Sequence, residues 1–271
     1  MSGAGFPLMP DPDHACASRY VDSGDVRLHY ERAGAGPPCI LLHGGFASHC
    51  FWGPVADRMR SRFDVTTLDS RGQGRSSDGR GPITYGRMAA DVVRVLDALG
   101  IERAHVIGHS DGGCIALHLL IDHPDRLRTA TLMGTPLHLV DYREGMHALL
   151  VKFTESMAAD LAQDPLGFAA HYRALSPHPE RWPELVRKLG ATWRTQPLFS
   201  DEMLRLVETP VLALGGDRDE FLAPEVFERA SRIFPRGTLV VVEGATHALP
   251  VSHPDVVVAA LDGFLEEPRE S

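Results

Sequence analysis

The sequence predicts an α/β fold in which a mostly parallel, twisted sheet carries helices on both faces. Short apolar strands alternate with helix-like segments along most of the 271 residues, and this alternation is typical of parallel sheets. Polar residues such as His43, Asp69, Ser110, Asp219 and His247 follow directly after predicted strands. Ligand sites of such sheets lie at the carboxyl ends of the strands. The same rhythm also indicates where an extra domain is inserted.

Each predicted element has a local signal. Residues 84–99 repeat apolar side chains at helical spacing, with Gly100 suited to the C-terminal cap. An apolar helix over 114–121 is ended by Pro124, and Pro254 opens a closing helix. Alternating or continuous apolar runs predict strands at residues 26–31, 39–42, 63–68, 104–107, 128–133, 210–214 and 238–242.

The strand rhythm stops between residues 138 and 208. This interval contains helical stretches at about 145–160, 165–174, 183–189 and 201–207, and many aromatic residues. We therefore predict a helical cap over 138–208, inserted into a core formed by residues 1–137 and 209–271. Residues 1–20 are expected to form a flexible lead-in, because they are rich in Pro, Gly and Asp and lack the basic start and apolar centre of a secretory signal.

Composition narrows the classes of function. A formal net charge of −9 without a basic run argues against nucleic-acid and anionic-membrane partners. No apolar run is long enough to span a bilayer. The four cysteines fit neither a disulfide framework nor a zinc motif, so a cytoplasmic location is the simplest expectation. No metal-binding spacing is present either, and we expect no metal and no organic cofactor.

The stretch Gly108-His109-Ser110-Asp111-Gly112 is the most informative motif. It is a G-x-S-x-G pentapeptide between a predicted strand and a predicted helix, which is the context of a nucleophile elbow. A serine on such a sharp turn needs glycine neighbours, because the next strand and helix pass close to it. An incidental serine in a glycine-rich turn is the alternative. The context favours Ser110 as a nucleophile.

A nucleophilic serine needs a base, and that base needs a carboxylate. His247 follows the last predicted strand and is the candidate base. Asp217 and Asp219 both follow the strand before it. We favour Asp219, which lies further into the loop, and expect Asp217 to cap the turn. The resulting order of Ser, Asp and His along the chain is the one expected with this elbow.

Two backbone amides should stabilise the oxyanion that develops during acyl transfer. One is the N–H of Asp111, the residue after the nucleophile. The other comes from the stretch His43-Gly44-Gly45-Phe46, where Gly45 is our choice and Phe46 the alternative.

Taken together, these motifs resemble those of the α/β-hydrolase superfamily, over about residues 26–264. The resemblance rests on the elbow and on four further motifs: His43-Gly44-Gly45, Asp69-x-Arg71-Gly72-x-Gly74-x-Ser76, Gly216-x-x-Asp219 and Gly244-x-x-His247. It implies that the Asp69 motif is a structural turn beside the active site. The serine at the elbow is unlike epoxide hydrolases and haloalkane dehalogenases, which have aspartate there.

The string Ser110-Asp111-Gly112-Gly113 is similar to that of valacyclovir-hydrolase-like enzymes. By this resemblance, the side chain of Asp111 would recognise the α-amino group of an aminoacyl ester. The alternative is that Asp111 caps the helix after the elbow, where the helix dipole favours an acidic residue. The sequence leaves both interpretations open.

The expected function is that of a serine hydrolase that cleaves a small-molecule carboxylic ester through an acyl-enzyme. Alternatives with the same triad are hydrolysis of a lactone, an amide or a carbon–carbon bond. A lyase or cyclase, or a ligand-binding receptor, is a more distant possibility. The cap is expected to set the size and hydrophobicity of the acyl group, and the sequence does not indicate an oligomeric state. The expected pocket residues are Phe46, His138, Tyr142, Phe153 and Trp193.

Overall fold

One sheet organises the chain in the computed structural model, which describes residues 18–159, 164 and 166–265. Its strand order is β1-β2-β4-β3-β5-β6-β7-β8. The strands from β4 to β8 are parallel, whereas β2 pairs antiparallel with both β1 and β4. The strands are β1 (Arg19–Ser23), β2 (Val26–Ala33), β3 (Pro38–Leu42), β4 (Asp64–Leu68), β5 (Ala104–His109), β6 (Leu127–Met133), β7 (Val211–Gly216) and β8 (Gly237–Val242).

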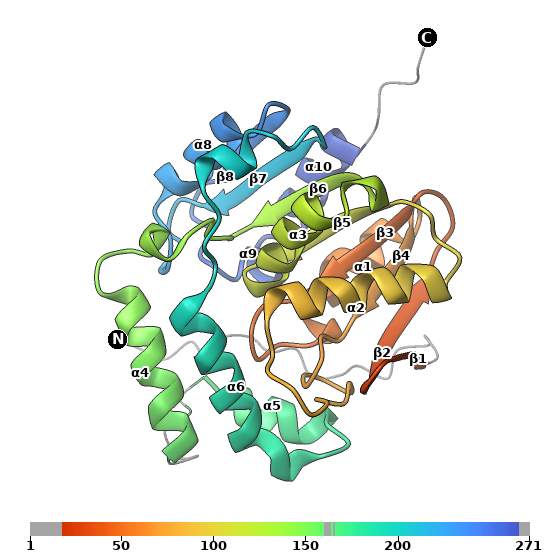
Figure 1. Cartoon of the computed structure of the whole chain (residues 1–271). Coiled ribbons are helices and arrows are strands. Elements are labelled where there is room, and N and C mark those ends of the chain that lie inside the picture. The colour runs from red at the N-terminus through yellow and green to blue at the C-terminus, as the bar shows by residue number, and fades with distance from the viewer. Residues whose placement is uncertain (1–17, 160–163, 165, 266–271) are drawn as a thin grey trace.

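Helices cover both faces of this sheet (Figure 1). Apolar residues of α2 (Tyr85–Ala98), α3 (Asp111–Asp122) and α8 (Pro224–Ile233) belong to one buried cluster. Those of α1 (Gly53–Met59), α9 (Leu249–Ser252) and α10 (Pro254–Leu265) belong to a second cluster on the opposite face. The predicted α/β class, a mostly parallel sheet between two helical layers, is confirmed.

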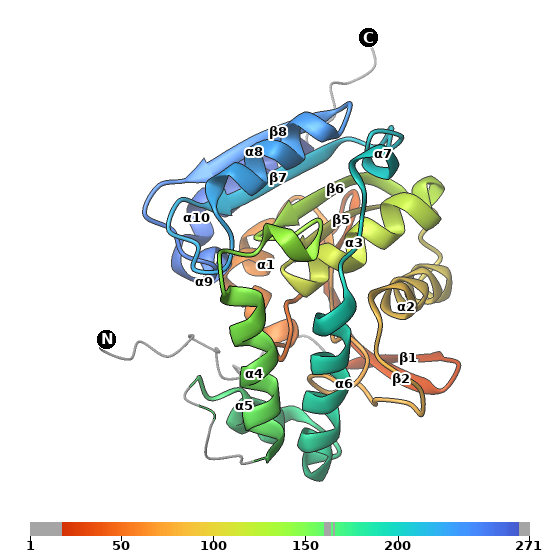
Figure 2. The same ribbon diagram turned by 60° about the vertical axis from the view of Figure 1, so that its left-hand side comes forward.

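Between β6 and β7 the chain forms α4 (Met146–Ala159), α5 (Phe168–Leu175), α6 (Trp182–Thr195) and α7 (Asp201–Leu204). Figure 2 shows α4, α5 and α6 grouped at one end of the molecule, whereas α7 lies apart from them, near β6 and β7. Buried cap residues such as Trp182 and Leu185 belong to the same apolar cluster as α2 and α3. The cap boundaries at 138 and 208 remain a prediction.

The sequence-based elements differ from the structure in several places. Arg19 and Tyr20, predicted to end a flexible lead-in, instead begin β1, where Tyr20 pairs with His29 and its ring lies under Arg27. Most of that lead-in, with Cys16, lies outside the described residues. Helix α6 begins at Trp182 and extends beyond the predicted end to Thr195. The short helices α1 and α8 have no counterpart among the predicted elements.

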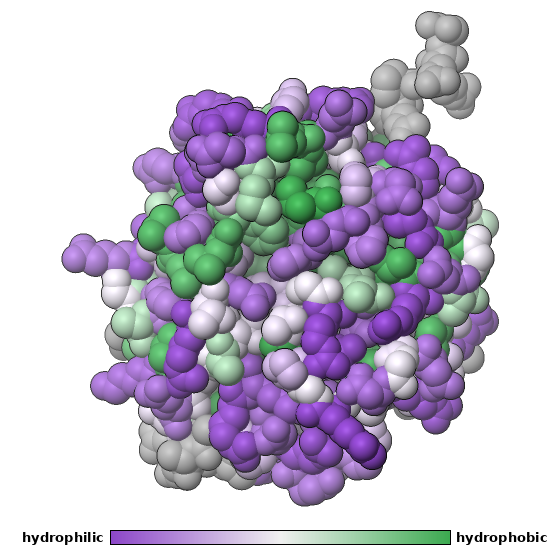
Figure 3. All heavy atoms as spheres, in the orientation of Figure 1, coloured by the Kyte–Doolittle hydropathy of each residue, from purple (hydrophilic) through white to green (hydrophobic). Residues whose placement is uncertain are grey.

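The surface is mostly polar. Figure 3 shows one face on which hydrophilic residues predominate and hydrophobic residues gather mainly in the upper half. Val140 and Leu206, which flank the helices between β6 and β7, are the most exposed large hydrophobic residues of the described chain. Within the described ranges, no helix combines the length and apolar character needed to cross a bilayer.

Candidate active site

The turn between β5 and α3 holds Ser110 in an unusual backbone conformation. Its φ of 53° and ψ of −115° lie outside the regions that L-residues ordinarily occupy. Glycine makes the turn possible, because a Cβ at Gly112 would overlap the carbonyl oxygen of Leu42 and one at Gly108 would overlap that of Gly112. The Ser110 amide donates to the carbonyl oxygen of Met133 at 2.9 Å. The serine is therefore fixed at the carboxyl ends of the central strands.

His247 and Asp219 meet at this same edge of the sheet. The Nδ1–H of His247 donates to Oδ2 of Asp219 at 2.8 Å, and both side chains are buried. The other oxygen of Asp219 accepts the amides of Phe221 and Leu222, which fixes the carboxylate. Asp217 is exposed and accepts the amide of Gly244 at 2.7 Å. Thus Asp219, and not Asp217, contacts the imidazole.

The backbone of His247 is held by two further contacts. Its amide donates to Oε2 of Glu220 at 2.9 Å, and its carbonyl oxygen accepts Nε2–H of His109 at 2.8 Å. The His109 and His247 rings lie 4.8 Å apart, and the Phe221 ring covers His247 at 4.6 Å. Because His109 precedes Ser110 in the chain, these contacts connect the elbow to the His247 loop.

Burial and charge have opposite effects on the His247–Asp219 pair. Burial disfavours the imidazolium, but attraction to Asp219 and the hydrogen bond that His247 donates to it outweigh burial and raise the pKa of His247. Burial also disfavours the ionised form of Asp219 and would raise its pKa. The charge and hydrogen bond of His247, together with the two backbone amides, outweigh burial and lower the pKa of Asp219. Asp219 is therefore ionised at neutral pH, and its hydrogen bond leaves Nε2 of His247 as the nitrogen available to a reacting group.

Ser110 and His247 line one cavity of about 320 Å³. Among the described residues, the Ser110 hydroxyl has no hydrogen-bond partner, and Ser110 is only half-buried. Nucleophile–base hydrogen bonds are often long without substrate and tighten only in the reacting complex. The structure thus brings the three predicted residues to one site, with the Asp219–His247 hydrogen bond formed.

The loop after β3 reaches the elbow through its glycines. A Cβ at Gly44 would lie 3.2 Å from Cβ of Ser110, and one at Gly45 would lie 2.8 Å from Oδ2 of Asp111. The Phe46 amide donates to Oε1 of Gln73 at 2.6 Å, so it is occupied in this structure. No described atom accepts the Gly45 amide, and the Asp111 amide lies in the first turn of α3, where N–H groups lack helical partners.

The carboxylate of Asp111 connects the core to α6. It accepts the hydroxyl of Tyr85 at 2.8 Å and the indole N–H of Trp193 at 3.0 Å. Burial raises the pKa of Asp111 to about 6, although both hydrogen bonds act in the opposite direction. Asp111 also stands at the start of α3, where a negative charge is favourable. Both carboxylate oxygens therefore already have protein donors.

The cavity is almost entirely apolar. Helix α4 contributes one wall, and Phe221 and Leu222 contribute another. Of the predicted pocket residues, Phe46, Tyr142, Phe153 and Trp193 line it. His138 is not among the described lining residues, because its Nδ1 accepts the Val140 amide and caps a short helical turn. The further apolar lining residues are Phe51, Pro136, Met146, Leu149, Leu150, Leu166 and Phe168.

Several residues of the site escaped the sequence analysis. Gln73, Tyr85, His109 and Phe221 each position a predicted residue, through the contacts given above. Tyr85 and Phe221 carry no motif that distinguishes them from packing residues. His109 lies within the elbow motif and Gln73 within the Asp69 motif. Their place in these motifs is the one sequence feature that could have indicated a role in the site.

Comparison with known proteins agrees with this architecture. The family model described as "alpha/beta hydrolase fold" matches residues 37–172, half of the chain and the part that includes the Ser110 elbow. The chain belongs to the α/β-hydrolase fold family. Asp219 and His247 lie outside the matched range, so their assignment depends on geometry.

Several curated relatives carry hydrolase names. "Putative carbamate hydrolase RutD" of Caulobacter sp. strain K31 is 29% identical over 276 residues, covering 90% of this chain and 98% of that protein. The protein of the same name from Azorhizobium caulinodans is 41% identical, but the match spans only 43% of its length and 42% of this chain. Carboxylesterase YbfK of Bacillus subtilis is 25% identical over 256 residues, covering 91% of this chain and 86% of its own.

Solved structures extend the agreement in fold. The crystal structure of the carboxylesterase CesB (YbfK) from Bacillus subtilis superposes with a TM-score of 0.77 at 24% identity, covering 94% of this chain and 93% of that one. A thermophilic esterase from Thermogutta terrifontis superposes with a TM-score of 0.76 at 23% identity, covering 92% of this chain and 98% of that one. These superpositions show that the chain shares the fold of these proteins.

Proposed function

We propose that this protein is a serine hydrolase that cleaves carboxylic esters carrying an apolar acyl or alkyl group. The observation that carries the proposal is the 2.8 Å hydrogen bond from His247 Nδ1 to Asp219, at a cavity that Ser110 also lines. A neutral imidazole oriented in this way keeps a basic Nε2 for the serine proton, which is the arrangement of a Ser-His-Asp triad.

The reaction would proceed in two steps. Ser110 Oγ attacks the ester carbonyl carbon while His247 Nε2 takes the hydroxyl proton, and that proton then goes to the departing alcohol. Water, deprotonated by the same imidazole, next attacks the acyl-serine carbonyl and releases the carboxylic acid. The amides of Asp111 and Gly45 would hold the oxyanion in both steps; loss of one such donor typically costs about 2.7–4 kcal/mol. The occupied amide of Phe46 supports Gly45 over Phe46.

The apolar cavity supports an ester substrate with a hydrocarbon group over a small polar carbamate. A pocket of about 320 Å³ lined by Met, Leu and Phe side chains favours burial of apolar surface. The fold and the triad are equally compatible with lactone, amide or carbon–carbon bond hydrolysis. The name of the RutD relatives makes carbamate hydrolysis the second candidate, and it belongs in the same experiment.

The Asp111 contacts support a positioning role over recognition of a substrate amine. Tyr85 and Trp193 already donate to the two carboxylate oxygens, so both oxygens have protein partners before a substrate binds. An α-aminoacyl ester and its des-amino analogue should therefore be hydrolysed at rates within a few fold. A large preference for the amino ester would contradict this role.

The test is kcat/KM for p-nitrophenyl acetate, p-nitrophenyl butyrate, a lactone, an anilide and an N-alkyl carbamate, with the wild-type protein and Ser110→Ala. The butyrate should be the best substrate, and Ser110→Ala should reduce its turnover by about 10⁴- to 10⁶-fold. Undiminished turnover by Ser110→Ala would refute the nucleophile. Faster cleavage of the carbamate than of the esters would overturn the proposed substrate class and leave the nucleophile intact.

A further inference from the structure

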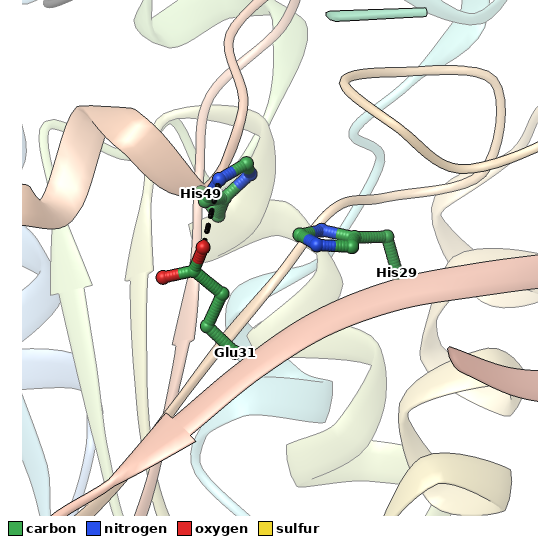
Figure 4. Close-up of side chains that lie close together, drawn as sticks. All are labelled: His29, Glu31 and His49. Atoms are coloured by element: carbon green, nitrogen blue, oxygen red, sulfur yellow. Dashed lines mark ion pairs between the residues drawn. The ribbon is translucent and has the colours of Figure 1, made fainter. Parts of the chain in front are cut away.

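A second group of ionisable side chains lies outside the residues that line the cavity. It is formed by His29 and Glu31 on β2 and by His49, which opens the short helix η1 (His49–Trp52) after the Gly45 loop. One ligand atom from each residue lies within 4.8 Å of the others, and all three residues are buried. Figure 4 shows the three side chains converging, with Glu31 and His29 two positions apart on the same strand. Alternate residues of a strand point to one face.

Asp69, directly after β4, orients both imidazoles from behind. His29 Nδ1 lies 2.9 Å from Oδ2 of Asp69, and His49 Nδ1 lies 2.9 Å from Oδ1. The amides of His49 and Arg75 also donate to this carboxylate. Because each ring gives its Nδ1–H to Asp69, a neutral ring keeps its lone pair on Nε2. A carboxylate behind a histidine in this manner is the usual support of metal-binding imidazoles.

His29 carries the observation that hydrogen bonding leaves unexplained. Its side chain is fully buried, and its Nε2 has no hydrogen-bond partner among the described residues. Such an unpaired buried nitrogen is costly. His49 Nε2 lies 3.4 Å from Glu31 Oε1 and 3.4 Å from Cys50 Sγ, so protonation of His49 would satisfy its own ring between Asp69 and Glu31. It would not give the Nε2 atom of His29 a hydrogen-bond partner.

We propose that His29 Nε2, His49 Nε2 and the Glu31 carboxylate bind one divalent transition-metal ion of the zinc type. Two imidazoles and one carboxylate are a donor set that Zn²⁺ accepts, with water as the fourth ligand. Ligands at about 2.0–2.1 Å in a tetrahedron lie about 3.3–3.4 Å apart, which matches the separation of His49 Nε2 and Glu31 Oε1. His29 must approach by a small side-chain shift.

Charge balance in this region is compatible with a cation. Glu31 and Asp69 supply two negative charges, and Arg60 and Arg75 form long ion pairs with Glu31 at 4.0 and 3.9 Å. The ion replaces the proton of His49 between the carboxylates. Its role is structural, because it joins β2 to the start of η1 and so holds the end of the loop that carries Gly45. The proposal departs from the motif-based expectation of no metal, because the spacing His29-x-Glu31 with a distant His49 matches no familiar metal-binding motif.

The test is titration of chelator-treated, full-length protein with Zn²⁺ by calorimetry, and with Co²⁺ by visible absorption. The wild-type protein should bind one equivalent of Zn²⁺ and give the intense Co²⁺ bands of a tetrahedral site. His29→Gln and Glu31→Gln should each weaken binding at least tenfold. His118→Asn is the matched control, because His118 and Asp122 form a half-exposed pair 3.2 Å apart that could bind zinc at the surface.

Two results would overturn the site: no Zn²⁺ binding by the wild-type protein, or binding lost in His118→Asn and retained in His29→Gln. Far-UV circular dichroism reports whether each variant folds. If His29→Gln does not fold, the Co²⁺ spectrum of the wild-type protein decides, because the weak bands of six-coordinate Co²⁺ would exclude the tetrahedral site. Binding should also raise the unfolding temperature of the wild-type protein and leave that of Glu31→Gln unchanged.

Discussion

At the scale of single residues, Asp219 determines which nitrogen of His247 can accept a proton. It fixes the imidazole by the Nδ1–H hydrogen bond, and its own position is fixed by the amides of Phe221 and Leu222. Its negative charge also raises the pKa of His247 against the effect of burial. We therefore expect Asp219 to control both the orientation and the basicity of His247.

Replacing Asp219 by Asn should change the rate and its pH dependence together. The base acts when neutral, so activity rises as the pH increases through the pKa of His247. Without the charge of Asp219 that pKa falls, and the acid limb of kcat/KM moves to lower pH. The plateau should drop by about 10⁴-fold, because Asn favours the wrong tautomer. The measurement is kcat/KM for p-nitrophenyl butyrate from about pH 5 to pH 9.

Asp217→Asn is the control for this experiment. Asp217 is exposed, and among the described residues its side chain bonds only the Gly244 amide. The Asp217→Asn variant should therefore keep the acid limb of the wild-type protein and nearly its rate. The proposed role of Asp219 would be contradicted if the acid limb of kcat/KM for Asp219→Asn stayed at the wild-type pH or moved to higher pH.

At the residue scale, the sequence indicates where a side chain lies when it directly follows a strand, but not when its contacts depend on packing between distant elements. Asp219 was preferred over Asp217 from its position in one loop, and only Asp219 contacts His247. The partners of Asp111 could not be predicted, because Tyr85 and Trp193 belong to α2 and α6. His138 was expected in the pocket, but its ring caps the turn beside it.

At the scale of elements, the elbow depends on the close approach of α3 to β3. A methyl group at Gly112 would overlap the Leu42 carbonyl oxygen, whereas Gly263 on the exposed side of α10 has no neighbour within 4 Å of its Cβ position. Gly112→Ala should lower the free energy of unfolding by about 3 kcal/mol or more through overpacking. Gly263→Ala should raise it by roughly 0.5–1 kcal/mol, because alanine is the better helix former.

Urea unfolding followed by far-UV circular dichroism measures both effects. Equal stability of Gly112→Ala and wild type would mean that the elbow can relax, and the steric account of its glycines would be wrong. The Gly263→Ala variant separates this steric effect from the general consequence of adding a methyl group to a helix.

The sequence predicted the central elements because their signals are local. Apolar runs specify β3, β5, β6 and β7, and helical spacing specifies α2, although boundaries shift by one or two residues. Strand β1 was missed because three of its five residues are exposed, so it lacks an apolar pattern and is defined by pairing with β2. The part of α6 beyond the predicted end makes tertiary contacts, because Thr192 donates to the Ile83 carbonyl oxygen and Trp193 donates to Asp111.

At the scale of the whole molecule, the cap and the core share one apolar cluster. Met157, Phe168 and Trp182 pack in the same cluster as Tyr85, Met88 and Leu137. The sequence suggested two units, because it reveals the break in strand rhythm but not the contacts across it. We expect the helices of 138–208 and the core to unfold in one transition.

Thermal unfolding followed by two probes tests this expectation. Trp182 and Trp193 lie on α6, whereas far-UV circular dichroism reports helices and strands of the entire chain. The midpoints from tryptophan fluorescence and from circular dichroism should coincide, as in a two-state transition. Variant Trp52→Phe removes the tryptophan of the core and should leave the midpoints coincident. A fluorescence transition at clearly lower temperature would mean that the cap unfolds independently.

The central claim is that His247, held by Asp219, activates Ser110. Its most direct test is reaction with a fluorophosphonate, followed by mass spectrometry of the intact protein and of its peptides. The wild-type protein should gain one phosphonyl group on Ser110, and folded His247→Gln should react at least about 10³-fold more slowly. No modification of the wild-type protein, modification at another residue, or equal rates in His247→Gln would contradict the claim.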